Sequence, residues 1–287
     1  MALTIQNSLS VNAYNPFVSS GSSYLVDNYS PVVAYTLQKI SSTQTNVIRV
    51  RRDSDNAEID VSASDITDGT LATWSAATDS HVTTWYDQSG NVNNLIQTTA
   101  GGQPRIVTAG VVETTNGIPS VKFVSGWTHS MSHTTPIINQ INTSSFIVSS
   151  NDSTNATGTV FHSSTTTSQG FKMYVDRSAC AYNTILQNTV PTNYIANLSV
   201  IRNDSNIRLT SIFVDSLKLM SSFDNGSTGG TNTFTGSFVS DGMIIGQTTG
   251  GFSKLIGSIS EIIIMNTDET SNRSAIETNI NDRYTIY

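Results

Sequence analysis

Hydrophobic residues recur along most of the chain in short runs with a two-residue period. Residues 81–94 show the pattern clearly, with Val82, Thr84 and Tyr86 on one face, Trp85 on the other, and then Asp-Gln-Ser-Gly-Asn. Such alternation is typical of a half-buried strand, and short polar side chains hold a turn through local hydrogen bonds. The stretch is therefore predicted to be a strand that ends in a self-bonded turn.

Similar short segments follow one another with turn residues between them. Strands at roughly regular spacing predict an antiparallel β-sandwich. Asp215-Ser216 is expected to be a two-residue hairpin turn, and residues 62–80 a loop with one helical turn. The expected strands lie near residues 46–52, 58–61, 103–107, 117–123, 146–148, 158–162, 171–175, 195–202, 207–214, 217–220, 243–246 and 258–265.

A short helix is expected near the N-terminus. Ser30 is a good N-cap and Pro31 suits the first helical turn, while Val33, Leu37 and Ile40 follow at helical spacing. This prediction depends on local spacing alone.

A second helix is expected at the C-terminus. Ser274 and Glu277 have the spacing of a capping box. Ile276, Ile280 and Tyr284 lie four residues apart and form one apolar stripe that would pack on a sheet.

Residues 1–24 are expected to form a separate N-terminal segment before a single domain at 25–287. Ser19-Ser20-Gly21-Ser22-Ser23 is a flexible joint. The preceding residues alternate only loosely, so this segment is either an ordered strand or an attachment arm.

The amino-acid composition is typical of an extracellular β protein. Only 12% of the 287 residues are charged, against about 25% in an average domain, and Ser, Thr and Asn take their place. The net charge of −7 argues against nucleic-acid binding. Arg49, Arg51 and Arg52 precede Asp53, Asp55 and Glu58, so local ion pairs are expected rather than a phosphate site.

No membrane insertion and no intrachain disulfide are expected. The longest purely apolar run is Ile262 to Met265, and Cys180 is the single cysteine. The first residues lack a Sec-type signal pattern. Release by lysis as part of a virus particle would reconcile this with the composition, and so would a mature secreted protein.

Few residues suggest chemistry. Asp87 begins the polar turn and is interpreted as its cap; the alternative is a Ca²⁺ ligand, completed by Asn91 or Asn93 and backbone carbonyls. Trp127, with Tyr182 and Tyr194 in Asn/Thr-rich loops, is the candidate surface for stacking on sugars. Trp85 is expected in the core, and Glu261 is expected to face solvent or to pair with a basic residue.

Several motifs together resemble a known fold family. Trp85 to Asn91 and then Gln103 to Val107 resemble the concanavalin A-like jelly rolls of the LamG-like group, found in phage virion proteins and bacterial surface proteins. Ile212 to Ser216 resembles the Val-Asp-Gly hairpin of that group, and Leu255 to Ile263 resembles its Gly-x-Ile-x-Glu strand. The resemblance implies an all-β antiparallel jelly-roll sandwich with a short N-terminal helix and a C-terminal helix.

The catalytic domain of family 54 arabinofuranosidases carries a stretch like Tyr86 to Asn91. That resemblance implies a nucleophilic Glu shortly after a Val-Asp pair, yet Val175-Asp176 is followed by no Glu in residues 177–180. It implies an acid Asp after a Gly-rich strand end, where Gln247 stands. The family's vicinal cysteine pair is absent as well. The chain is therefore not expected to be an enzyme.

The leading hypothesis is a non-enzymatic structural protein of a phage virion, a capsid, fibre or tail module that decorates the particle or binds host surface glycans. Its expected partners are other virion proteins, reached through the N-terminal arm, and sister subunits of a homo-oligomer. The alternatives are a carbohydrate-binding module of a secreted or cell-surface bacterial protein and a glycoside hydrolase with relocated carboxylates.

Overall fold

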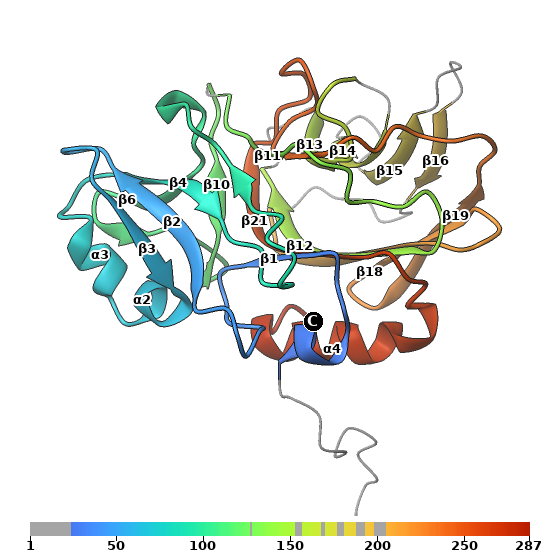
Figure 1. Cartoon of the computed structure of the whole chain (residues 1–287), viewed down its shortest axis with the longest axis horizontal. Coiled ribbons are helices and arrows are strands. Elements are labelled where there is room, and N and C mark those ends of the chain that lie inside the picture. The colour runs from blue at the N-terminus through green and yellow to red at the C-terminus, as the bar shows by residue number, and fades with distance from the viewer. Residues whose placement is uncertain are drawn as a thin grey trace, which may run out of the picture.

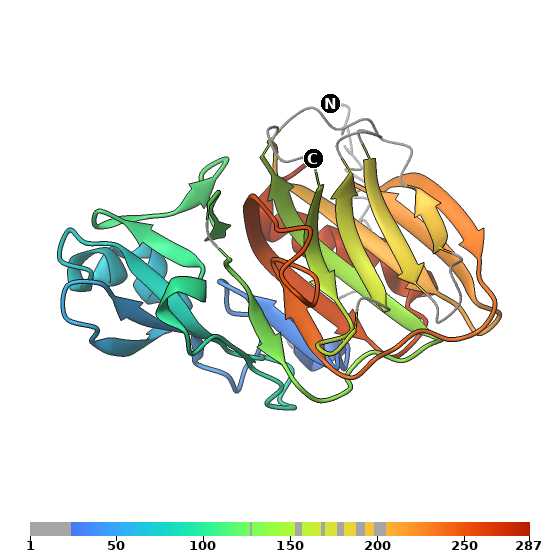
Figure 2. The same ribbon diagram turned by 90° about the horizontal axis from the view of Figure 1, so that it is seen from above.

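The computed structural model describes residues 24–126, 128–152, 157–167, 170–176, 181–187, 193–197 and 205–287. Within them nineteen strands form one continuous antiparallel sheet that folds into two layers, called here the back sheet and the front sheet, and a helix lies on the outer face of one layer (Figures 1 and 2). The prediction of an all-β sandwich with a C-terminal helix is confirmed. The expected N-terminal arm lies outside the described residues, apart from Tyr24.

The back sheet is built around the last strand of the chain. Its pairing order is β6 (Arg105–Thr108), β10 (Val121–Phe123), β21 (Gly257–Met265), β12 (Thr143–Asn151), β17 (Arg208–Val214), β18 (Leu219–Asp224) and β19 (Ser227–Thr233). A further strand, β1 (Val33–Thr36), pairs with the second half of β21.

The front sheet combines strands from the N-terminal part and the middle of the chain with one late strand, β20. Its pairing order is β3 (Glu58–Ser62), β2 (Asn46–Arg52), β4 (Ser80–Trp85), β5 (Leu95–Ile96), β11 (Met131–His133), β20 (Met243–Ile245), β13 (Thr157–His162), β14 (Phe171–Asp176), β15 (Ala181–Gln187) and β16 (Asn193–Asn197). Short pairings join β6 to β4 and to β7 (Val111–Val112), and β8 (Thr114–Thr115) to β9 (Ile118–Pro119).

Strands β12 and β21 are buried on both faces, which explains their long apolar runs. Ile147 and Ile262 point into the core between the sheets. Phe146 and Ile263 point outward into a second core under α4 (Arg273–Tyr284). Figure 1 shows α4 lying along this outer face. The predicted stripe of Ile276, Ile280 and Tyr284 is confirmed, since all three pack there.

The helix expected from Ser30 is wrong. Val33–Thr36 form β1, whose residues pair with Ile264 to Glu261 of β21, and the single turn α1 (Leu25–Asn28) precedes it. The helical spacing of the apolar residues is outweighed by pairing with a strand more than 200 residues later. Local propensity often yields to tertiary contacts of this kind.

The capping box predicted for α4 is also wrong. Asn272 is the N-cap residue and makes no side-chain cap, while Glu277 pairs with Arg273 at 2.6 Å. A capping box occurs instead in α2 (Ala63–Thr67), between Ser62 and Asp65. The loop expected at 62–80 contains two helices, α2 and α3 (Thr70–Trp74). Elsewhere in the described residues, short 3₁₀ helices lie at Ala100–Gly102 and Thr270–Asn272.

The turn expected at Asp215-Ser216 is longer than predicted. It extends to Lys218, and one carboxylate oxygen of Asp215 accepts hydrogen bonds from the backbone N–H groups of Leu217 and Leu219, both at 2.8 Å. The expected ion pairs near β2 are confirmed. They join Arg49 to Glu58 and Asp60, Arg51 to Asp53, and Arg52 to Asp55.

A buried ion pair fixes α4 to the back sheet. The side chain of Glu261 is fully buried, and both its oxygens accept from the guanidinium of Arg283, at 2.5 and 2.8 Å. The Tyr284 hydroxyl also donates to Glu261, at 3.1 Å. The expected pairing of Glu261 with a basic residue is therefore confirmed, and its solvent-facing alternative is wrong. None of the helices in the described part of the chain has the length and apolar character needed to cross a membrane.

Candidate functional site

Asp87 lies two residues after the end of β4 and is 4% exposed. One carboxylate oxygen accepts from the backbone N–H groups of Ala34 and Ser89, both at 2.9 Å. The other accepts from the Ser89 hydroxyl at 2.7 Å and from the backbone N–H of Asn93 at 3.0 Å. Four donors therefore occupy the acceptor positions of the carboxylate. This geometry matches the turn-capping interpretation.

The other two predicted calcium ligands also serve the turn. The amide nitrogen of Asn91 donates to the carbonyls of Pro31 and Val32, and that of Asn93 donates to Val32, all at 3.1 Å. A cation would require amide oxygens instead. Among the described residues, no group of three or more His, Cys, Asp or Glu is placed to hold a metal ion. Asp87, Asn91 and Asn93 thus join the turn to the segment that enters β1.

The loop that connects β20 to β21 is a candidate ligand-binding surface. Gln247 stands where the family 54 resemblance implies an acid Asp. Its amide nitrogen donates to the hydroxyl of Ser130 at 3.1 Å, and its amide oxygen is buried with no hydrogen-bond partner in the described structure. An amide does not exchange a proton as a general acid does. Position 247 can therefore orient a ligand or a water molecule, but it cannot protonate a leaving group.

Phe252 closes the same loop after its turn and is 72% exposed. The backbone N–H and the hydroxyl of Thr248 both donate to the Phe252 carbonyl, at 3.0 and 2.9 Å. The Thr249 hydroxyl fixes the loop to the Ser164 carbonyl at 2.8 Å. Gly250 and Gly251 both have positive φ, and this allows the tight turn. We call residues 247–252 the platform loop, because it holds an exposed aromatic ring in a hydrogen-bonded frame.

The predicted sugar-stacking residues are placed only in part. Trp127 lies outside the described residues. Tyr182 and Tyr194 lie on strands β15 and β16, so the loops expected there are wrong. Tyr194 is opposite Leu186, four residues along β15 from Tyr182, and the two tyrosines therefore do not occupy neighbouring positions. The sequence interpretation missed Phe252, although an aromatic residue directly after Gly-Gly is a signal for an exposed loop tip.

Two buried histidines remain neutral at physiological pH. Burial, helped by the charges of His81 and Arg105, lowers the pKa of His129 to about 4. Burial also lowers the pKa of His162 to about 4, with a further contribution from Lys172. His129 accepts a hydrogen bond from the backbone N–H of Val124 at 3.2 Å and so closes the turn before β11. These groups fit structural roles.

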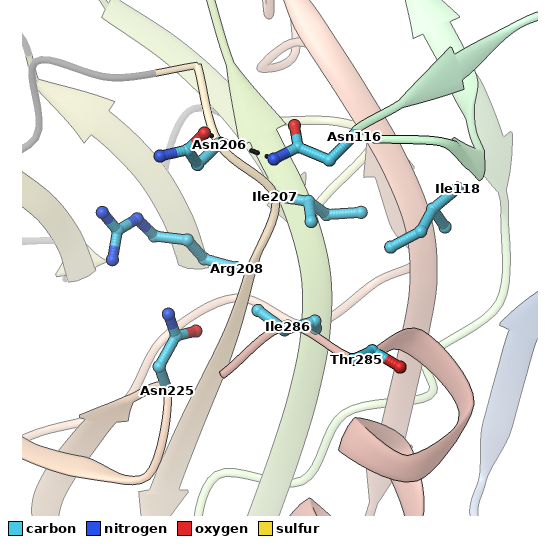
Figure 3. Close-up of a pocket in the computed structure, with 8 residues that line it drawn as sticks. All are labelled: Asn116, Ile118, Asn206, Ile207, Arg208, Asn225, Thr285 and Ile286. Atoms are coloured by element: carbon cyan, nitrogen blue, oxygen red, sulfur yellow. Dashed lines mark hydrogen bonds between the residues drawn. The ribbon is translucent and has the colours of Figure 1, made fainter.

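A hollow of about 240 Å³ opens on the α4 side of the back sheet (Figure 3). Its rim carries asparagines from three separate segments, and isoleucines from three segments lie between them. Asn116 belongs to the β8–β9 turn, Asn206 precedes β17, and Asn225 belongs to the β18–β19 turn. The lining residues are Asn116, Ile118, Asn206, Ile207, Arg208, Asn225, Thr285 and Ile286.

Comparison with known proteins finds similar structures but no similar sequences. No model of a protein family matches the sequence, and no curated protein is significantly similar to it. The structure is similar to a GH54 α-L-arabinofuranosidase soaked with a cyclic sulfate inhibitor, with a TM-score of 0.52 and 16% identity over 87% of this chain and 62% of that one. It is also similar to an arabinofuranosidase in complex with arabinofuranosyl-α-1,2-xylobiose, with a TM-score of 0.53, 17% identity and the same two coverages.

A third similar structure is the CBM40 domain of the Ruminococcus gnavus IT-sialidase bound to α2,3-sialyllactose. Its TM-score is 0.40 and its identity 18%, over 46% of this chain and 79% of that one. At these identities the likeness to the two arabinofuranosidases shows a shared β-sandwich fold. The chain spans 62% of the length of the arabinofuranosidases.

Proposed function

We propose that this chain is a non-enzymatic glycan-binding domain whose platform loop contacts the sugar. The observation that carries the proposal is the exposed ring of Phe252 on a loop fixed by hydrogen bonds from Thr248 and Thr249. An aromatic face packs against the C–H face of a sugar ring, and fixing it in advance lowers the entropy cost of binding. The amide of Gln247 lies at the base of the same loop.

The absence of catalysis is part of the proposal, and it rests on residue chemistry. A retaining glycosidase needs two carboxyl groups about 5–5.5 Å apart. The position that the family resemblance assigns to the acid carries Gln247, whose amide is fixed to Ser130. Asp87 and Glu261 have all or most of their acceptor positions filled by protein donors.

A glycan array probed with the wild-type chain and with Phe252→Ala tests the proposal. We expect binding by the wild type and a loss of tenfold or more in Phe252→Ala. Leu217→Ala is the matched control, because Leu217 is 79% exposed at a hairpin tip on β17–β18 and should not affect binding. No binding to any glycan, or equal binding by Phe252→Ala, would overturn the proposal. A parallel array with EDTA shows whether Ca²⁺ takes part.

We further propose that the domain acts on the surface of a phage particle, attached through residues 1–24. This second part is supported by the LamG-like sequence motifs and by the Ser/Thr/Asn-rich composition. Mass spectrometry of purified particles tests it directly. Detection of the chain only in the medium of uninfected cells would favour the alternative, a secreted or surface-bound bacterial carbohydrate-binding module.

The fold shared with the arabinofuranosidases keeps a glycoside hydrolase as the competing function. Incubation with 4-nitrophenyl α-L-arabinofuranoside discriminates between them. We expect no nitrophenol above the uncatalysed rate. Turnover that a single Asp or Glu substitution abolishes would establish an enzyme with relocated carboxylates.

A further inference from the structure

The hollow on the α4 side of the back sheet has the features of a second binding site. It is separate from the platform loop, since Ile207 and Ile286 belong to the core between α4 and the back sheet. The platform loop instead connects the front sheet to the start of β21. Any ligand of the hollow would therefore be bound independently of Phe252.

Two of the rim asparagines are held by tight turns. Asn116-Gly117 connects β8 to β9, and Asn225-Gly226 connects β18 to β19. All four residues have positive φ, between 46° and 80°, as two-residue type I′ hairpin turns require. Turn geometry explains why Asn occurs at each position. It does not explain why the amides of two distant hairpins and of Asn206 converge on one hollow.

Some amide atoms of the three asparagines are not used in hydrogen bonds to other described residues and could bind a ligand. The amide nitrogen of Asn116 donates to the amide oxygen of Asn206 at 3.3 Å (Figure 3). The amide oxygen of Asn225 accepts from the backbone N–H of Leu209 at 2.9 Å. The amide oxygen of Asn116 and the amide nitrogens of Asn206 and Asn225 have no hydrogen bond to another described residue. The rim thus offers one acceptor and two donor groups, with the donor of Asn206 next to the acceptor of Asn116.

The charge and size of the hollow restrict the ligand. Arg208 is the one charged lining residue, and it is paired with Asp224 at 3.5 Å, so the rim presents no uncompensated cation to an anion. The apolar lining residues are Ile118, Ile207 and Ile286. A volume of about 240 Å³ is below the usual range of roughly 300–1,000 Å³ for drug-sized ligands. A single neutral ring with an apolar face and polar edges fits these limits.

We propose that this hollow binds one neutral pyranose unit. The C–H face of the ring packs on the three isoleucines. One hydroxyl of a neighbouring pair donates to the amide oxygen of Asn116, and the other accepts from the amide nitrogen of Asn206. Asn225 donates to a third hydroxyl. For a ligand of this size we expect a dissociation constant on the order of millimolar.

Saturation-transfer NMR on the full chain tests the proposal. The probes are methyl α-D-glucopyranoside, methyl α-D-mannopyranoside and methyl β-D-galactopyranoside, with N-acetylneuraminic acid as the anionic comparison. Saturation of methyl resonances should transfer to the ring protons of at least one neutral pyranoside, because the lining includes Ile118, Ile207 and Ile286. The double variant Asn116→Gly, Asn225→Gly removes both amides and keeps residues that tolerate positive φ.

We expect the double variant to weaken binding tenfold or more, while Asn142→Gly leaves it unchanged. Asn142 also has positive φ but does not line the hollow, so it controls for the backbone effect. Thermal unfolding shows that each variant is folded. The proposal is overturned by absence of transfer to all three neutral sugars, by transfer only to the anionic one, or by equal transfer in the double variant. Loss of transfer in Phe252→Ala alone would place the sugar at the platform loop instead.

Discussion

Replacing Arg283 by Met tests whether the buried ion pair holds α4 against the back sheet. Glu261 is fully buried and has three polar contacts in this region, two with the Arg283 guanidinium and one with the Tyr284 hydroxyl. Arg283→Met keeps a long apolar stem beside the ring of Tyr284 but removes both charge-assisted bonds. A carboxylate would then remain buried with one donor.

The expected cost follows from that geometry. Removing one partner of a buried pair costs about 3–5 kcal/mol, because the remaining charge is left uncompensated. For a domain of this size each kcal/mol shifts the melting temperature by about 2–4 °C, so the shift should be roughly 6–20 °C downward. Adding Glu261→Gln removes the charge while a carbonyl oxygen still accepts from Tyr284. The double variant Glu261→Gln, Arg283→Met should therefore regain at least half of the lost stability.

Urea unfolding followed by tryptophan fluorescence measures these differences, and Trp85, which is fully buried in the core, reports on unfolding. Arg49→Met provides the control, since Arg49 forms ion pairs with carboxylates at the surface and such pairs contribute at most about 1 kcal/mol. A free energy of unfolding of Arg283→Met within 1 kcal/mol of the wild-type value would show that the ion pair does not hold α4 in place. A double variant whose free energy of unfolding is as low as that of Arg283→Met would contradict the role of the uncompensated charge.

Three further predictions concern stability. Asp87→Ala should lower the free energy of unfolding by about 3 kcal/mol in urea titrations, because it leaves buried donors unpaired, and EDTA should not shift the wild-type midpoint. The pKa of His129 and of His162 is about 4 when folded, against about 6.5 unfolded, so the unfolded chain binds more protons between these values. Stability should fall as pH falls from 6.5 to 4, and His162→Leu should reduce that slope; an unchanged slope contradicts the assignment. Asn225→Ala and Asn225→Gly both lose the hydrogen bond from the Leu209 N–H, and Asn225→Ala should be less stable than Asn225→Gly by about 1 kcal/mol in thermal unfolding, because only alanine is strained at a φ of 46°.

The sequence predicts the sandwich well because its two strongest signals are local. Two-residue alternation and clusters of turn residues both act within about ten residues, and they identify most strands. The segment from Val33 to Thr36 escapes this reasoning, since its strand conformation depends on β21, which lies more than 200 residues later. The missing cap of α4 has a similar cause. Its first turn is held by pairing of Arg273 with Glu277 rather than by Ser274.

The candidate sites are harder to predict from the sequence than the fold, because each one is formed by residues that are distant in the chain and meet only in the folded structure. Asn116-Gly117 and Asn225-Gly226 are recognisable as hairpin turns, yet nothing in the spacing shows that both lie beside Asn206. The exposure of Phe252 depends on how two glycines with positive φ turn the platform loop outward. For Asp87 the deciding donor is the N–H of Ala34, 53 residues earlier in the chain.

The two carboxylates that the sequence offers for chemistry are both used to hold the fold together. Asp87 receives its donors from β1 and from its own turn, and Glu261 receives the guanidinium of Arg283. Freeing either group for acid–base work would require breaking bonds that fix β1 or α4 to the rest of the sandwich. Among the described residues, the platform loop and the hollow present mainly amides, hydroxyls and apolar side chains. Groups of this kind bind and orient neutral sugars, and this chemistry supports the proposal of a glycan-binding domain.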